Sequence, residues 1–239
     1  MVSVAQALER VKHDVAGLLS PESIRQICRE VSHQWRERQF GPVTTIHLFV
    51  HQILHHNTAC SHLGHIVGEP ITAPASCRAR QRLPLDVFEI LVKRVAWLLE
   101  RTTSPVEGFR GHRTWIVDGS GFSMPDTPAL QKQFGQPGGQ KAGCGFPVAH
   151  LLALFNADTG MIRETIVAPL RTHDLSQVDK LHPLLRPGDL LLADRGFCSY
   201  AHLALILKGG LHAVFRVHQR HIVDFKPGRP QRHNLSKPE

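Results

Sequence analysis

Two aspartates follow directly on short apolar runs, and their residue type and position suit metal chemistry. Asp118 comes after Thr114–Val117, and Asp194 comes after Leu190–Ala193. A short apolar run bounded by turn residues predicts a strand that is buried on both faces. Open α/β sheets gather ligands beyond the carboxyl ends of such strands. The two carboxylates are therefore expected to meet if the two strands are neighbours.

Two carboxylates in close proximity repel each other, and a divalent cation between them removes that repulsion. Hard oxygen ligands favour Mg²⁺ or Mn²⁺, which retain water and complete their coordination shell with phosphate. In a two-metal site one ion activates an attacking hydroxyl and the other stabilises the leaving oxygen. Asp118 and Asp194 therefore predict metal-dependent phosphodiester cleavage or strand transfer.

Other interpretations of these acids stay open. An aspartate before glycine often occupies a turn, so Asp118 alone carries little information. The repetition of the pattern at Asp194 is what favours a paired site. Arg195 either contacts phosphate or pairs with Asp194. Asp189 is expected in a Pro-Gly-Asp turn, and Asp174 is expected at the start of a helix.

The second half of the chain shows strand and turn patterns that define how the two aspartates are positioned. The expected elements are strands at 115–117, 146–155 and 161–168, a helix from Asp174, a strand from Leu190, a helix at 199–208 and a strand at 211–217. A Gly/Pro/Gln-rich loop is expected over 121–145. This order is that of a ribonuclease-H-like mixed sheet, whose first and fourth strands are parallel neighbours. Asp118 and Asp194 would then face one another.

Residues 3–101 show helical periodicity throughout, which predicts an all-helical N-terminal region. Helix starts are marked by Ser3 with Gln6 and by Ser20 with Pro21. The predicted helices begin at Ser3, at Ser20 (as far as Gly41-Pro42), near Thr45, near Ser61 and at Leu85. A change of composition near residues 102–105 indicates a boundary between this region and the sheet.

A segment rich in arginine, Ala75–Pro84, lies between these helices. On a helix Arg78 and Arg82 share a face while Arg80 points elsewhere, so one groove is not expected to take all three. A phosphate-binding surface and a solvated basic face explain this segment equally well. The candidate DNA-contacting residues in the whole chain are Arg78, Arg80, Arg82, Lys132, Lys141 and Arg195.

Histidine is abundant, with 17 residues in the chain, and six of them lie between residues 47 and 65. On a helix His47, His51 and His55 share a face at a spacing compatible with metal binding. The segment contains no Cys-x-x-Cys or His-Glu-x-x-His pattern. A polar helix face near phosphate is the alternative, and the role of these histidines stays open.

The overall charge favours a polyanionic partner, with nucleic acid as the leading candidate. Lys and Arg number 28 against 20 Asp and Glu, a formal net charge of +8. The five cysteines form no Cys-x-x-Cys pair, which suits a reducing cytoplasm. No apolar run reaches the length of about 18 residues that a membrane-spanning helix needs, and no signal peptide pattern is present. We therefore expect a soluble cytoplasmic protein that associates with the nucleoid.

Several motifs together resemble those of bacterial insertion-sequence transposases of the DDE class, the family typified by insertion sequence four. The motifs are Val117–Ser120, Cys144–Phe146, Pro187–Tyr200 and Val214–Val217. Ala75–Pro84 is similar to the arginine-rich stretch that this family carries before its catalytic domain. The resemblance covers roughly residues 40–220, and it is most specific at Asp194-Arg-Gly-Phe197 and its leucine-rich approach.

The resemblance implies metal-dependent cutting and rejoining of double-stranded DNA at transposon ends. It implies that Asp118 and Asp194 are the first two acids that bind Mg²⁺ or Mn²⁺, and that the N-terminal helices contact transposon DNA. The family's third acid is a glutamate within Tyr-Arg-Glu-Lys on a later helix. After Asp194 the sequence contains only Asp224 and Glu239 as acids, and neither lies in that signature. The chain therefore looks like the front part of a transposase, with impaired chemistry.

We thus predict three parts of the chain. They are a helical DNA-binding region at 1–104, a ribonuclease-H-like core at 105–220 that is incomplete at its C-terminus, and a flexible basic tail at 221–239. One alternative is a non-catalytic fragment that binds transposon DNA as an inhibitor or remnant. A compact metal nuclease that recruits Asp174 or Glu164 is another alternative. The recognised DNA ends and a homodimeric state are left open.

Overall fold

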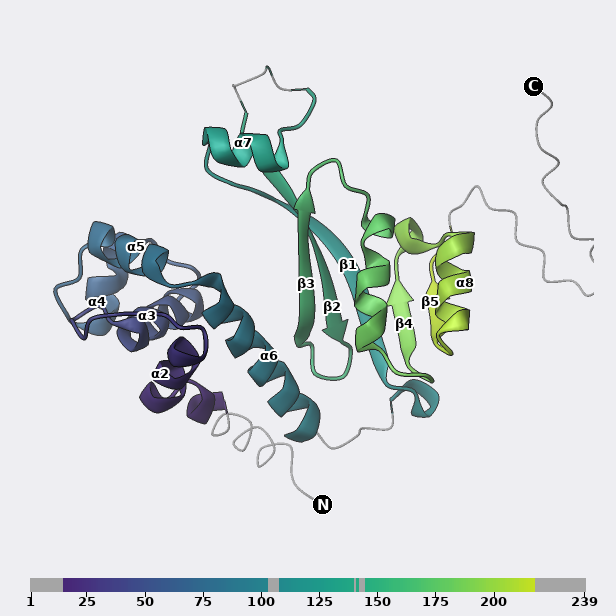
Figure 1. Cartoon of the computed structure of the whole chain (residues 1–239), viewed down its shortest axis with the longest axis horizontal. Helices are drawn as coiled ribbons and strands as arrows, with labels where there is room; N and C mark the ends of the chain where they lie inside the picture. The colour runs from purple at the N-terminus through teal and green to yellow at the C-terminus, as the bar shows by residue number, and fades with distance from the viewer. Residues whose placement is uncertain (1–14, 103–107, 140, 142–144, 218–239) are drawn as a thin grey trace, which may run out of the picture. The chain divides into compact units, whose positions relative to one another are not determined.

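The computed structural model describes residues 15–102, 108–139, 141 and 145–217 of the 239 (Figure 1). Helices make up the first part: α2 (Pro21–Glu30), α3 (Pro42–Leu54), η1 (Cys60–His62), α4 (Leu63–Val67), α5 (Ala73–Arg82) and α6 (Leu85–Thr102). The predicted helix start at Ser3, the boundary at residue 104 and the tail after residue 220 lie outside the described residues.

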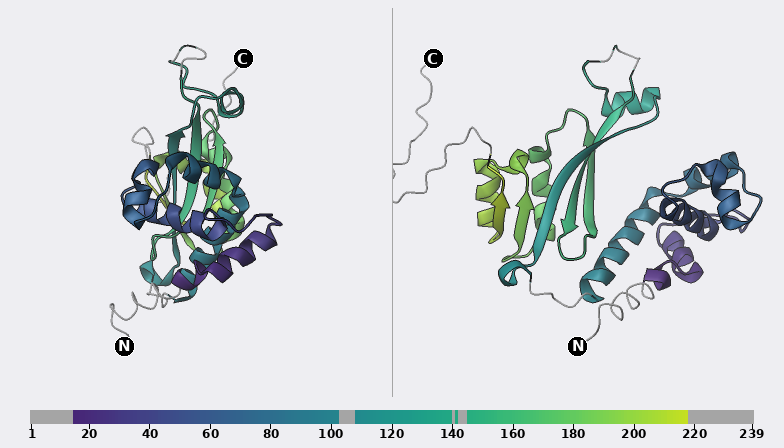
Figure 2. Two further views of the ribbon diagram at one scale, coloured as in Figure 1. Left: turned by 90° about the vertical axis from the view of Figure 1, so that its left-hand side faces the viewer. Right: turned by 180° about the vertical axis from the view of Figure 1, so that it is seen from behind.

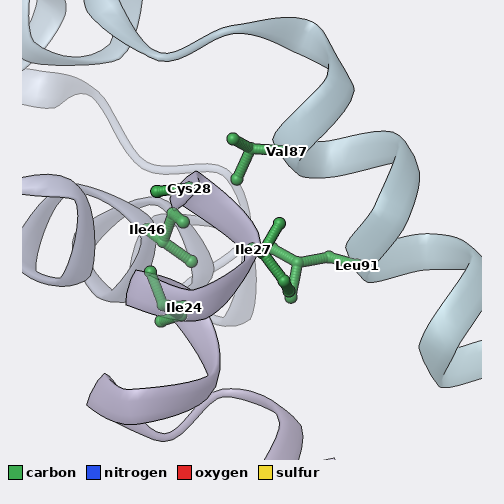
Figure 3. Close-up of a cluster of buried hydrophobic side chains, with 6 residues drawn as sticks. All are labelled: Ile24, Ile27, Cys28, Ile46, Val87 and Leu91. Atoms are coloured by element: carbon green, nitrogen blue, oxygen red, sulfur yellow. The ribbon is translucent and has the colours of Figure 1, made fainter. Parts of the chain in front are cut away.

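The helix α2 begins where the sequence predicts it. Ser20 is the N-cap, its Oγ accepts a hydrogen bond from the Ser23 amide at 3.3 Å, and Pro21 takes the first helical turn. A buried core joins α2 to α3 and α6 (Figure 3), and its members are Ile24, Ile27, Cys28, Ile46, Val87 and Leu91. Two predicted bounds are wrong. The helix expected to continue to Gly41-Pro42 already ends at Glu30. The helix expected from near Thr45 begins at Pro42, because proline suits the first helical turn.

The second part builds a five-stranded sheet with the order β3-β2-β1-β4-β5. Its strands are β1 (Thr114–Ser123), β2 (Val148–Asn156), β3 (Ile162–Pro169), β4 (Leu190–Ala193) and β5 (His212–Phe215). β4 and β5 are parallel, with Leu190 opposite His212. This is the mixed sheet with the ribonuclease-H-like strand order that the sequence predicts, and it makes β1 and β4 neighbours.

Short helices precede the first strand or connect later ones. They are η2 (Phe109–Gly111), α7 (Pro128–Phe134), η3 (Asp174–Ser176), η4 (Val178–Leu184), η5 (Arg195–Phe197) and α8 (Tyr200–Lys208). Figure 2 shows β1 as a long strand that runs from η2 to α7. The described residues divide into two compact units, one drawn from residues 15–115 with 153–166 and the other from residues 116–152 with 167–217. Within the second unit, α8 contacts both β5 and η4. The three predicted parts of the chain stay a prediction.

β1 is longer than predicted, and this changes the place of Asp118. The strand continues to Ser123, so Asp118 lies inside it and does not end it. The reason is pairing with β2, which provides backbone partners beyond the apolar run, as far as the bond from the Met124 amide to the Pro147 carbonyl at 2.8 Å. Such tertiary pairing overrides the turn preference of an Asp-Gly-Ser segment.

Two further expectations are wrong in detail. The helix expected from Asp174 is a pair of 3-10 helices, η3 and η4; the N-cap of η3 is His173, which makes no side-chain capping bond. Pro183 lies inside η4 and lacks an amide donor, which disfavours a regular α-helix there. The loop expected over 121–145 contains the end of β1 and the helix α7, whose N-cap Thr127 accepts from the Leu130 amide.

Candidate functional site

Asp118 presents its carboxylate on the exposed side of β1. In this strand the buried residues Trp115 and Val117 alternate with the exposed residues Ile116 and Asp118. Asp118 Oδ1 accepts a hydrogen bond from the Gly119 amide at 2.8 Å. This short-range bond orients the carboxylate and leaves Oδ2 without a partner among the described residues.

Asp194 caps the turn that follows β4. It is the N-cap of η5, and its Oδ1 accepts a hydrogen bond from the Gly196 amide at 2.7 Å. The side chain is exposed, whereas Leu190 and Leu191 behind it are buried. The strand β4 therefore ends in an anchored carboxylate whose second oxygen points to no partner within the described part of the chain.

The sheet brings these two carboxylates onto adjacent strands, since β1 and β4 are neighbours in the strand order. Figure 1 shows both strands running in the same direction. Within the described ranges, neither Asp118 nor Asp194 forms an ion pair, so Arg195 is not paired with Asp194 and remains an exposed cation on η5. Two exposed carboxylates therefore lie on neighbouring inner strands of the sheet, without an ion-pair partner in the described ranges.

The carboxylates of Asp118 and Asp194 fit two of the ligand positions around a hard divalent cation. Carboxylate oxygens are the ligands that Mg²⁺ and Mn²⁺ prefer, and each aspartate keeps one oxygen unbonded. Among the described residues, no group of three or more His, Cys, Asp or Glu side chains gathers around a metal position. Glu164, one of the alternative acids, pairs with Lys93 at 3.7 Å. The histidines between residues 47 and 65 form no such group either.

Asp174 occupies a different place, against Gly119 of β1. A Cβ atom built on Gly119 would lie 2.7 Å from Asp174 Oδ2, so a larger residue would require the Asp174 carboxylate to move. The other oxygen, Oδ1, lies 3.5 Å from His150 Nδ1 on β2. A glycine inside a strand signals such a close approach, and the sequence interpretation missed it by treating Gly119 as part of a turn. Asp189 lies in its predicted turn, where Oδ2 accepts from the Arg186 amide at 2.9 Å.

A basic groove of about 950 Å³ lies in the helical part. Its lining contains four arginines, namely Arg36, Arg38, Arg78 and Arg82, next to Trp35 and Phe40. The groove takes Arg78 and Arg82 together and not Arg80, as predicted. The sequence interpretation missed Arg36 and Arg38, which come from the segment between α2 and α3.

Arg80 has partners inside the helical part. Its guanidinium donates to Gln52 Oε1 at 2.9 Å and to Cys60 Sγ at 3.4 Å, and it lies 5.2 Å from the centre of the Phe49 ring. These contacts join α5 to α3 and η1. The groove therefore uses Arg78 and Arg82, while Arg80 links helices.

Glu37 lies between Arg36 and Arg38 in sequence but does not neutralise them. Its Oε1 accepts from Trp35 Nε1 at 3.0 Å and from Arg25 Nε at 3.4 Å. These interactions, the Trp35 bond first, hold the pKa of the Glu37 carboxyl below its usual value. Within the described ranges, none of the four groove arginines forms an ion pair, so their charge is available to an anion.

The two candidate lysines lie apart from this groove. Lys132 is exposed on α7 and lines a second hollow of about 610 Å³ together with Arg171. Lys141 is exposed, and its carbonyl accepts from Gln136 Nε2 at 2.6 Å. None of the helices that the structure describes is long and apolar enough to cross a bilayer.

Comparison with known proteins identifies the family. A family profile described as the transposase DDE domain matches residues 109–238, more than half of the chain, including both aspartates. The chain belongs to the DDE transposase family. This transposase chain is 25% identical over 126 residues to InsZ of Escherichia coli (strain K12), which is named as a candidate transposase; the match covers 52% of the chain and 42% of InsZ. The match thus spans about two fifths of that curated relative.

Solved transposase complexes share weaker similarity with this transposase chain. One is the cryo-EM structure of the piggyBac transposase synaptic complex with hairpin DNA, with a TM-score of 0.45 and 14% identity over 95% of this chain and 54% of that chain. Another is the Mos1 transposase paired-end complex with the left transposon end, with a TM-score of 0.29 and 11% identity over 76% of this chain and 60% of that chain.

Proposed function

We propose that this chain contributes to cutting and rejoining DNA at the ends of an insertion sequence, with Asp118 and Asp194 as metal ligands. The observation that carries the proposal is the placement of two exposed, unpaired carboxylates on the neighbouring strands β1 and β4, inside the segment that matches the transposase DDE domain. If Asp118 and Asp194 lay in ordinary surface turns, nothing would place their two carboxylates on adjacent strands. The transposase function of the family supports the choice of DNA as substrate.

The chain's own residues orient the ligands. Amides of Gly119 and Gly196 each hold one carboxylate oxygen, so Asp118 and Asp194 keep a fixed direction without losing their second oxygen. A bound Mg²⁺ or Mn²⁺ would supply Lewis-acid activation of the attacking hydroxyl and stabilisation of the leaving oxygen. Arg195 follows Asp194 directly and is exposed, which suits contact with the scissile phosphate. Because the described residues add no third ligand, we expect weak metal binding and slow catalysis.

The test is strand cleavage of a DNA duplex that carries the insertion sequence's own ends, in Mn²⁺ and in Mg²⁺. We expect slow, metal-dependent cleavage, and we expect Asp194→Asn to reduce it by at least about 100-fold. Asp158→Asn is the matched control, because Asp158 is an exposed aspartate in the hairpin turn between β2 and β3. Cleavage that survives in Asp194→Asn would rule out the proposed site.

The basic groove favours a second candidate function, a DNA-binding protein without catalysis that occupies transposon ends. Four unpaired arginines, together with two aromatic side chains, suit the phosphate backbone of double-stranded DNA. The two candidates differ in the cleavage assay. Metal-independent DNA binding without any cleavage would support the binding protein and reject the enzyme.

The groove makes a quantitative prediction about DNA affinity. Arg78→Gln with Arg82→Gln removes two phosphate contacts, so the slope of log affinity against log salt should become less negative by about 1.8, which is about 0.9 per contact. Fluorescence anisotropy over a salt series measures this slope. Arg29→Gln is a control for the loss of one charge outside the groove, since Arg29 is exposed on α2 and does not line the groove. Equal slopes for the groove variant and the control would contradict the assignment.

A further inference from the structure

Two histidines meet edge to edge next to the turn that carries Asp194. His182 of η4 and His202 of α8 approach with their Nε2 atoms 3.0 Å apart, and their rings are nearly parallel at 9°. His202 is only 3% exposed, and its ring also stacks on Phe215 of β5. A buried imidazole normally needs a partner for each ring nitrogen, and this one has both.

The partners define where the protons lie. His202 Nδ1 is 2.8 Å from the Phe197 carbonyl oxygen, which can only accept, so Nδ1 carries the proton. Nε2 of the neutral ring is then an acceptor, and His182 Nε2 must donate to it. Burial lowers the pKa of His182, and the neighbouring His202 lowers it further. Burial also lowers the pKa of His202, so both rings are neutral near pH 7.

The acceptor carbonyl belongs to the turn of Asp194. Phe197 ends η5, the one-turn helix whose N-cap is Asp194, and the Phe197 side chain is 2% exposed. Its amide lies 3.3 Å from the Asp194 carbonyl, and the Gly196 amide donates to Asp194 Oδ1. Fixing the Phe197 carbonyl therefore fixes the frame that orients the Asp194 carboxylate.

We propose that His202 is a positioning residue for Asp194, acting through the Phe197 carbonyl, and that His182 fixes the His202 tautomer. The inference rests on the proposed function of Asp194 as a metal ligand. A histidine that only fills the core would stabilise the fold without affecting the Asp194 turn. A metal site formed by the two histidines is less consistent with the contacts, because the metal would have no further His, Cys, Asp or Glu ligand among the described residues.

The experiment compares two replacements of His202 that each keep one of its bonds. In His202→Asn the amide nitrogen lies near the former Nδ1 and can still donate to Phe197. In His202→Gln the amide lies near the former Nε2, so the bond to Phe197 is lost and the bond to His182 is kept. His65→Asn, at an exposed histidine of α4, is the control.

Two measurements on the full chain read out the effect. Amide hydrogen exchange at Gly196 and Phe197 should become about tenfold faster in His202→Gln, as expected for the loss of one hydrogen bond, and should change little in His202→Asn. Calorimetric Mn²⁺ titration should show weaker binding in His202→Gln only. If both variants exchange like the wild type at these amides, or if both accelerate equally, the positioning role is wrong.

Imidazole ¹⁵N NMR tests the tautomer independently of any activity. We expect His202 protonated at Nδ1 and His182 at Nε2 in the neutral protein, without change on addition of Zn²⁺ or a chelator. A His202 ring protonated at Nε2, or a spectrum that responds to Zn²⁺, overturns the inference. A wild-type chain that binds no Mn²⁺ would reject the proposed function, while the exchange and NMR results would still decide whether His202 holds the turn.

Discussion

Asp194→Asn should lower the Mn²⁺ affinity of the chain by about 100-fold or more, and Asp118→Asn should do the same. Removing a residue that only hydrogen-bonds to a metal ligand commonly costs about 10–100-fold in affinity, and these residues are proposed to bind the ion directly. Asparagine keeps an oxygen that can accept from the Gly196 or Gly119 amide, so the local turn and strand stay in place. The change is therefore confined to the negative charge that holds the cation.

Isothermal titration calorimetry measures the affinities, and a thermal melt with Mn²⁺ or EDTA measures the coupled stability. A ligand at about 100 times its Kd stabilises the folded state by about 2.7 kcal/mol, so the wild type should melt higher with Mn²⁺ than with EDTA. Neither aspartate variant should show that difference, whereas Asp158→Asn should. The wild type should bind Mn²⁺ at one site, and each single variant should weaken that same site, because both residues are proposed ligands of one ion. A titration in which each single variant retains one Mn²⁺ site of wild-type affinity would indicate two separate sites.

That the two aspartates lie on neighbouring strands could be predicted, because the local apolar runs and the order of strands and helices along the chain agree. Leu190–Ala193 is a continuous apolar run before a carboxylate, and the structure makes it the strand β4 with the same bounds. The order of strands and helices along the chain then predicts a ribonuclease-H-like sheet, which makes β1 and β4 neighbours. A single sequence defines best a strand with a continuous apolar run, and a sheet for which the order of elements leaves few possible topologies.

Features that depend on pairing between distant segments could not be predicted. Nothing in Asp118-Gly-Ser indicates a strand until β2 lies beside it, since glycine and serine favour turns in isolation. The basic groove arises because residues 33–40 lie against α5, so Arg36 and Arg38 join Arg78 and Arg82 only in the folded chain. The bond between His182 and His202 likewise depends on the packing of η4 against α8.

Gly119→Ala should destabilise the fold by less than about 1 kcal/mol, because the new Cβ would overlap only the carboxylate end of the Asp174 side chain, which is one third exposed and can rotate away. The new atom would lie 2.7 Å from Oδ2 and 3.0 Å from Cγ, and the backbone of Gly119 does not lie in the left-handed region. The cost therefore comes from this contact alone. Gly121→Ala is the control on the same strand, since its Cβ would meet Val148 Cγ1 at 3.6 Å and the Ala149 carbonyl oxygen at 3.8 Å, ordinary van der Waals distances.

A double-mutant cycle separates this clash from other effects. Asp174→Ala alone removes only a partly exposed contact with His150, which is worth less than about 1 kcal/mol. In the Asp174→Ala background, Gly119→Ala should cost even less, which gives a coupling energy of about 0.5 kcal/mol in urea unfolding. Because the Gly119 amide donates to Asp118 Oδ1, displacement of β1 in Gly119→Ala should also weaken Mn²⁺ binding, and the double variant should restore it. If Gly119→Ala cost the same in the wild type and in the Asp174→Ala background, Asp174 would not lie against the strand that carries Asp118.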